Sequence, residues 1–300
     1  MPGARGFAYR LALVTVGATL ALIVAGGLVT NTGAGLAVPD WPTTYGYNMF
    51  LYPWSGMVGG IFFEHSHRVL GAVVGLLTVA LAVALWRSGP ALRALGIAAV
   101  VAVIAQGVLG GLRVVLLKDT LALVHGCLAQ AFFALIVTIA LLASPAMRAA
   151  SRVTDPSLRA LTVIAAGLVY VQIVFGALLT HAGRIDLHLA GALVVFSFVP
   201  IVTARVRRSG DPVAAPFSRV LVAALGVQLV LGAGSYLARF SSIALPGGQL
   251  AVLVLPVAHR LVASIILGAA VALAVRVIVS PRLERWAPGV ELTAAARGAS

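Results

Sequence analysis

Charged residues are scarce in this 300-residue sequence, and acidic residues are the scarcest. Only 10% of the residues are charged, with 8 acidic against 21 basic side chains. A soluble domain carries about a quarter charged residues, so this composition excludes an ordinary soluble fold. Cysteine is almost absent as well, because Cys127 is alone. An internal disulfide is therefore impossible, and cysteine usage says nothing about the redox compartment.

Apolar residues make up 61% of the chain and gather in runs that are long enough to cross a bilayer as helices. The first run follows Arg5 and Arg10 as in a signal peptide, but it lacks a clear cleavage site, so we expect it to be retained. We predict an all-α integral membrane protein with an unstructured tail from Ser280. Its eight transmembrane helices are expected at residues 11–30, 65–86, 92–117, 121–143, 158–180, 187–206, 217–238 and 256–279.

The formal charge of +13 could indicate a nucleic-acid partner, but the basic residues lie between the apolar runs and not on one face. They indicate topology instead, because cytoplasmic loops of membrane proteins are rich in arginine and lysine. One set of helix ends carries most of the arginines, from Arg5 and Arg10 to Arg282 and Arg285. We predict no nucleic-acid partner and a multi-pass protein of the cell membrane with both termini in the cytoplasm.

A short pattern recurs in every odd-numbered run and ends in Gly26, Gly110, Gly176 or Gly232. Four residues before these glycines stand Leu22, Gln106, Gln172 and Gln228, and a histidine opens every even-numbered run. We interpret the chain as two pseudo-symmetric four-helix bundles, residues 1–150 and 151–280, followed by a cytoplasmic tail at 281–300. The glycines could admit a flat ligand or mark ordinary close packing of membrane helices.

Four of the six histidines, His67, His125, His188 and His259, occupy equivalent places in this repeat. Each has a glycine or alanine four positions later on the same helix face, which leaves room for a planar macrocycle. A helix N-terminus and apolar surroundings both disfavour imidazolium and so keep a ring nitrogen free for a metal. We predict that His67 pairs with His125, and His188 with His259, as axial ligands of two haem irons.

Two other interpretations of the histidines stay open at this point. Zinc is less suitable, because Glu64 is the one nearby carboxylate and no thiolate lies near the other histidines. Hydrogen bonding between helices is the second alternative, although ionisable groups in a membrane are usually functional. His65 and His181 are expected at the interface or in a supporting role.

Three charged residues accompany the histidines. Glu64 shares a helix face with His67. It could accept a proton or stabilise charge beside a reacting group. Alternatively, it is a helix-opening carboxylate that the helix dipole favours. Arg68 and Arg260 each follow a histidine and could pair with haem propionates or extend to the interface. We predict Glu64 and Arg68 as the catalytic residues. The long loop at 31–63 is rich in aromatic residues, and it is either a lid over an apolar ligand or an interfacial belt.

Several motifs together resemble one family. The run from Thr32 to Leu36 with Pro39-Asp40-Trp41-Pro42 resembles the first outer loop of the haem A synthase family. The segment Glu64-x-x-His67-Arg68 resembles that family's glutamate–histidine–arginine signature, and His125, His188 and His259 match its other histidines. The resemblance covers nearly the whole chain, from about residue 10 to about residue 280.

The resemblance implies oxidation of the C8 methyl group of haem O to the formyl group of haem A by successive hydroxylations. His67 and His125 would face haem O, His188 and His259 would hold a resident haem b, and Glu64 would act at the reacting methyl. Haem O would come from a membrane haem O synthase, haem A would go to haem-copper oxidases and their assembly factors, and an unidentified acceptor would take the electrons. Many bacterial members have two loop cysteines where this chain has Val38 and Thr44, so a role of a loop disulfide does not transfer.

Two other functions fit parts of the pattern. A di-haem membrane cytochrome that only transfers electrons would use the same four histidines, and Glu64 would then be incidental. A transporter would account for the duplication, but transporter repeats usually contain helices broken near the membrane midplane, and these apolar runs are mostly uninterrupted. We therefore predict an oxidoreductase, a haem A synthase.

Overall fold

The computed structural model describes residues 2–243 and 245–284. Its eight long helices are α1 (Pro2–Asn31), α2 (Gly60–Leu85), α3 (Pro90–Leu116), α4 (Asp119–Ala143), α5 (Ser157–Ala182), α6 (Ile185–Arg208), α7 (Ala214–Phe240) and α8 (Gln249–Glu284). Short 3-10 turns are η1 (Met49–Leu51), η2 (Trp54–Gly56) and η3 (Pro145–Arg148). All eight long helices are apolar enough to cross a membrane, which confirms the predicted all-α, multi-pass class.

The helices run beyond the predicted spans at most of their ends. We expected α2 to begin at residue 65 and α8 at 256, but they begin at Gly60 and Gln249. The prediction of an unstructured chain from Ser280 is wrong for residues 280–284, which continue α8; residues 285–300 lie outside the described part. Residues 61–63 and 250–255 are themselves apolar, so the expected starts of these two helices were placed too close to the histidines.

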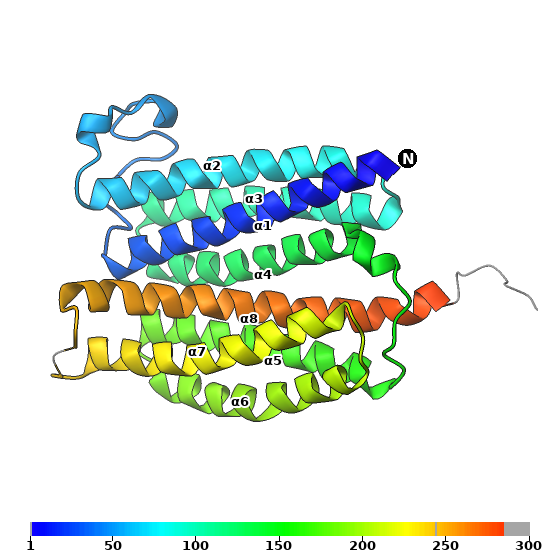
Figure 1. Ribbon diagram of the computed structural model, residues 1–300. Coiled ribbons are helices and arrows are strands. Elements are labelled where there is room, and N and C mark those ends of the chain that lie inside the picture. Colours follow the sequence, from blue (N-terminus) through cyan, green and yellow to red (C-terminus); the bar gives the residue numbers. More distant parts are fainter. Residues whose placement is uncertain (1, 244, 285–300) are drawn as a thin grey trace, which may run out of the picture.

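The two halves of the chain have the same pattern of helix contacts. In the first half α1 and α3 each contact both α2 and α4, and in the second half α5 and α7 each contact both α6 and α8. Helices α4 and α8 lie at the centre, where α8 contacts both α1 and α4 (Figure 1). An axis relating the halves, and the domain boundaries at 150 and 280, stay predictions.

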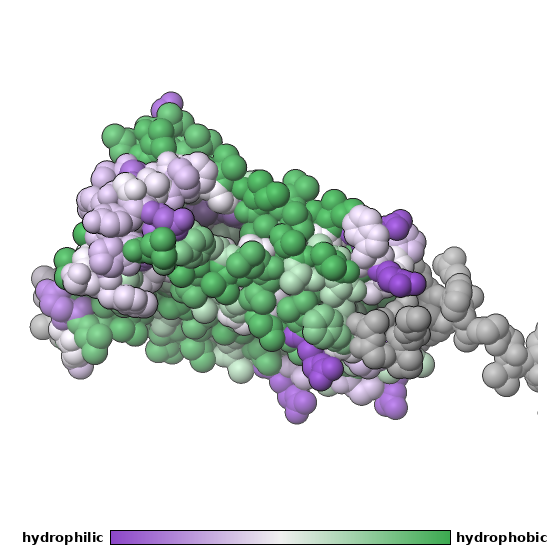
Figure 2. Space-filling view, turned by 90° about the horizontal axis from the view of Figure 1, so that it is seen from above, coloured by the Kyte–Doolittle hydropathy of each residue, from purple (hydrophilic) through white to green (hydrophobic). Residues whose placement is uncertain are grey.

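The two ends of the bundle differ. The four even-numbered helices all begin at the end that carries the loop between α1 and α2, and the described chain begins and ends at the opposite end (Figure 1). An apolar belt covers the middle of the surface, and polar residues gather towards both ends (Figure 2). The predicted histidines therefore belong to the loop end, and which side of the membrane that end faces stays a prediction.

A buried ion pair stabilises the opposite end. Arg276 of α8 and Asp211, between α6 and α7, form two hydrogen bonds of 3.1 and 2.8 Å, and both side chains have no exposed surface. Arg276 also donates to the carbonyl oxygens of Ala149 and Ala150 in the segment that joins the halves. Asp211 accepts further bonds from Ser151 and from the backbone N–H of Arg152. One charge pair thus connects three segments that are far apart in the sequence.

We expect Asp211→Asn to lower the free energy of unfolding by about 3–5 kcal/mol, because it removes the carboxylate that pairs with the buried guanidinium of Arg276. The matched control is Asp155→Asn, which removes a half-exposed pair with Arg205 and should change stability little. Equilibrium unfolding of the purified protein in detergent measures both variants. Equal effects of the two substitutions would contradict a structural role for the buried pair.

The same pair predicts a pH dependence. Burial alone would raise the pKa of Asp211. Hydrogen bonds from Arg276 and from the backbone N–H groups of Arg152 and Ala214 outweigh that effect and lower the pKa to about 2. An unfolded aspartate has a pKa of about 3.9, so this carboxylate stabilises the fold above pH 4 and loses that contribution as the pH falls towards 2. Unfolding measured from pH 6 downwards should show a steeper loss for the natural protein than for Asp211→Asn.

Candidate functional site

Four histidines of the even-numbered helices meet in two pairs. The ring centroids of His67 and His125 are 6.3 Å apart, and those of His188 and His259 are 6.2 Å apart. The rings stand steeply to one another, at interplanar angles of 84° and 68°. The structure therefore brings together the residues that the sequence paired, from α2 and α4 in one half and from α6 and α8 in the other.

We had expected each of the four histidines to open its helix, but none of them is the first residue of its helix. His188 lies in the first turn of α6, whereas His67, His125 and His259 lie further inside α2, α4 and α8. The argument from the helix dipole was therefore wrong for three of the four, since the dipole acts mainly within the first turn. Low polarity of the surroundings still favours the neutral ring, because Nδ1 of His67, His125 and His259 is buried.

The glycine of the sequence repeat faces the imidazole in all four cases. A Cβ atom on Gly26, Gly110, Gly176 or Gly232 would lie 3.0, 3.4, 3.4 or 3.1 Å from Cε1 of His67, His125, His188 or His259, respectively. Carbon atoms at rest are about 3.5–4.0 Å apart. Each odd-numbered helix thus provides a place without a side chain where the ring of the following helix packs.

Glutamine approaches the histidine in the second half of the chain. Nε2 of Gln172 lies 3.2 Å from Nδ1 of His188 and donates to the carbonyl oxygen of His188 at 2.9 Å. Nε2 of Gln228 lies 3.2 Å from Nε2 of His259. The side chain of Gln106 is buried with no hydrogen-bond partner among the described residues. We had noted these glutamines as part of the repeat but had not predicted these contacts.

The two pairs have the donors and the spacing that a haem iron requires. Bonds between imidazole nitrogen and a metal are about 2 Å long, so two imidazoles on one metal have ring centroids roughly 6 Å apart. Nδ1 of His67, His125 and His259 makes no hydrogen bond within the described chain, and such orphaned buried nitrogens are rare. No group of three or more metal-binding side chains occurs among the described residues, but a haem iron takes only axial ligands from the protein. The residues therefore fit a bis-histidine haem.

Glu64 and Arg68 contact the loop between α1 and α2 more than they contact each other. Oε2 of Glu64 accepts from the backbone N–H of Val38 at 2.9 Å, and Oε1 accepts from Arg68 at 2.7 Å. Arg68 also donates to the carbonyl oxygens of Val38, Asp40 and Thr43. Both carboxylate oxygens and both terminal guanidinium nitrogens are thus engaged by the protein itself.

The remaining predicted residues have simpler surroundings. His65 is buried, with Nδ1 lying 3.1 Å from the hydroxyl of Thr44. Arg260 donates to the carbonyl of Gly27 at 3.2 Å and to Thr180 at 3.4 Å. His181, which lies just beyond the expected span 158–180, is an exposed residue of the last turn of α5. None of these contacts tests a role in haem binding, so the role of Arg260 stays a prediction.

Comparison with known proteins is consistent with this geometry. Residues 55–186 match the COX15-CtaA family of cytochrome oxidase assembly proteins. The chain is 30% identical to the haem A synthase of Shouchella clausii over 57% of its residues, and 32% identical to that of Bacillus pumilus over 50%. A third haem A synthase, from Alkalihalophilus pseudofirmus, is 33% identical over 42% of the chain.

This chain is similar to haem A synthases over about half of its length. The matches extend over 58, 50 and 43% of the length of these three haem A synthases. The family match contains Glu64, His67, Arg68 and His125, but it ends before His188. The family match therefore covers α2, α3, α4 and α5 and begins after residues 38–43 of the loop.

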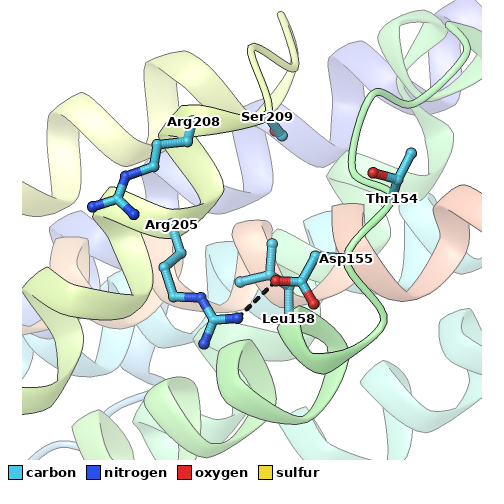
Figure 3. Close-up of a pocket in the computed structure, with 6 residues that line it drawn as sticks. All are labelled: Thr154, Asp155, Leu158, Arg205, Arg208 and Ser209. Carbon is cyan, nitrogen blue, oxygen red and sulfur yellow. Dashed lines mark hydrogen bonds and ion pairs between the residues drawn. The ribbon is translucent and has the colours of Figure 1, made fainter.

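A hollow of about 380 Å³ lies far from the histidines, at the opposite end of α5 and α6 (Figure 3). Its lining includes Arg205 and Asp155, which form an ion pair of 2.7 Å, and also Arg208. His188 lies in the first turn of α6, whereas Arg205 lies in its last turn. This hollow is therefore not part of the haem A synthase-like site.

We expect Gly232→Ala to lower the haem content of the purified protein, because the new methyl group would press on the ring of His259. Replacing glycine by alanine inside a helix otherwise stabilises it by up to about 1 kcal/mol, so a loss cannot come from helix propensity. Gly226→Ala is the control in α7, since a Cβ there meets nothing within 4 Å. Haem per protein is measured by pyridine haemochrome, and equal content in both variants would contradict the packing role of Gly232.

Proposed function

We propose that this protein is a haem A synthase, an oxidoreductase that converts the C8 methyl group of haem O to the formyl group of haem A. The observation that carries the proposal is the spacing of the two histidine pairs, at 6.3 and 6.2 Å. The similarity to three haem A synthases adds independent support.

In this proposal the two halves have different tasks. His188 and His259 hold a resident haem b, and His67 and His125 bind haem O. Bound haem supplies the redox chemistry of the site. The protein fixes the orientation of the imidazoles through Gly26, Gly110, Gly176 and Gly232, whose missing side chains let each ring pack against a neighbouring helix. Such fixed orientation of ligands is a main contribution of a protein to a metal centre.

The charged residues act around the haem and not on its iron. Arg260 has long bonds of 3.2 and 3.4 Å to Gly27 and Thr180, and we propose that it turns towards a haem propionate. Glu64 and Arg68 were expected to act directly at the substrate. Because their polar atoms bind the loop, we propose that they act on the site through the loop.

The proposed setting is the cell membrane, with both termini in the cytoplasm and the haem sites near the outer face. Arginines concentrate at the end of the bundle where the described chain begins and ends, as the positive-inside tendency requires. Proposed partners are a haem O synthase that delivers the substrate, haem-copper oxidase assembly factors that receive the product, and a separate electron acceptor.

A di-haem cytochrome without chemistry on the porphyrin is the alternative function. It would use the same four histidines, and the engagement of both oxygens of Glu64 by the protein favours it. A haem A synthase must in addition release a changed haem, whereas a cytochrome keeps both haems. The haems that accompany the protein therefore distinguish the two functions.

Acid–acetone extraction of the purified protein, produced together with a haem O synthase, should yield haem b and also haem O or haem A. His67→Ala should abolish haem A and keep haem b, because the resident pair is intact. His181→Ala is the control, since that side chain is exposed and lies outside both pairs. Chromatography of the extracted haems measures all three proteins, and haem b alone from the natural protein would favour the cytochrome.

A further inference from the structure

The loop between α1 and α2 is bound to α2 through its backbone. Val38 both donates its N–H to Glu64 at 2.9 Å and accepts from Arg68 at 3.0 Å. Arg68 also donates to the carbonyl oxygens of Asp40 and Thr43 at 2.7 and 3.1 Å. Hydrogen bonds to charged groups are stronger than those between neutral groups. Four of them concentrate on residues 38–43, beside His67 of the same helix.

The same loop is bound to α3 through close contacts at two glycines. A Cβ on Gly111 would overlap the indole ring of Trp41, and a Cβ on Gly35 would overlap the guanidinium of Arg113. Gly111 directly follows Gly110, which faces the ring of His125. Trp41 is 42% exposed, so one part of its ring packs on α3 while the rest forms the surface. The loop therefore contacts α2 and α3 at residues that are sequence neighbours of His67 and of Gly110.

Asp40 keeps this part of the loop in one shape. Its carboxylate accepts from the backbone N–H of Tyr45 and Gly46 at 2.7 and 2.8 Å, and from the hydroxyl of Thr43. Burial alone would raise the pKa of Asp40. Hydrogen bonds from Gly46, Thr43 and Tyr45 outweigh that effect and hold the pKa below its ordinary value. The carboxylate is therefore charged at neutral pH, when these bonds are strongest.

We propose that Glu64 and Arg68 are positioning residues that fasten residues 38–43 as a cover over the His67–His125 pair, with Trp41 seated on Gly111 as the part of the cover nearest to His125. The corresponding connection in the second half is short, since only Gly183 and Arg184 separate α5 from α6. The proposal rests on the proposed function only in so far as the covered ligand is a haem. It differs from a direct catalytic role, because Glu64 then affects the site through the loop.

The first experiment displaces Trp41 without altering Glu64 or Arg68. Gly111→Ala in the full-length purified protein should speed hydrogen exchange of peptides covering residues 38–46 by about tenfold. The matched control is Gly107→Ala, one turn earlier in α3, where a Cβ meets nothing within 4 Å. Equal exchange in the two variants, measured by mass spectrometry, would overturn the seating of the loop on α3.

The second experiment separates the two bonds of Glu64. Glu64→Gln retains an oxygen that can accept from Val38 but removes the charge opposite Arg68, whereas Glu64→Ala removes both bonds. Loop exchange should therefore rise from the natural protein to Glu64→Gln and again to Glu64→Ala. Loop exchange unchanged in Glu64→Ala would show that the carboxylate does not fasten the loop.

The third experiment tests the covering of haem. Transfer of haem to excess apomyoglobin, followed by absorbance, should become about tenfold faster for the first pair in Gly111→Ala and stay unchanged for the second pair. Faster loop exchange with unchanged haem transfer would refute the cover. Preparations without haem would instead contradict the proposed function, while loop exchange would still decide whether Glu64 and Arg68 fasten the loop.

Discussion

The close approach of an imidazole to a glycine on the neighbouring helix is the constraint on which this structure depends. It occurs four times, at 3.0–3.4 Å from a Cβ that glycine lacks. Any larger residue at these positions would push the ring away and change the 6.2–6.3 Å spacing of the pairs. Ordinary helix packing also uses small residues, but it does not require one opposite every histidine. The glycine of each sequence repeat therefore marks where the imidazole ring of the following helix packs.

This explains why the sequence predicts the pairing so well. The glycine and histidine patterns lie in apolar runs, and helical geometry converts their spacing into position along the bundle. Eight helices and both pairs follow from that. The depth of His67, His125 and His259 inside their helices does not follow, because α2, α4 and α8 begin earlier than the expected spans, and the added residues of α2 and α8 are mostly apolar. The dipole argument failed for that reason.

Contacts between distant segments could not be predicted. Asp211 and Arg276 are 65 residues apart and look like ordinary polar residues near helix ends, yet both are fully buried together. The hydrogen bonds from Arg68 go to backbone carbonyl oxygens of the loop. Every residue has such an oxygen, so the sequence does not indicate which ones accept. Glu64 was assigned chemistry from its position beside His67, whereas its actual partners lie in a loop whose fold has no helical period. Periodic spacing in a sequence predicts helices and the residues on one helix face. Contacts between a helix and a loop have no such spacing, so the sequence does not predict them.

The departures from the repeat all fall on the first half. Leu22 stands where the other odd-numbered helices have glutamine, and the side chain of Gln106 makes no hydrogen bond within the described chain. Gln172 and Gln228, in contrast, both approach the histidines of the second half. A polar partner beside a ligand fixes its ring and strengthens binding of the metal, which suits a haem that stays. A site that must take in one haem and release another benefits from weaker fixing of its ligands and from a cover that can open. The loop bound by Glu64 and Arg68 belongs to the first half, so these features agree with the proposal of a substrate site at His67 and His125.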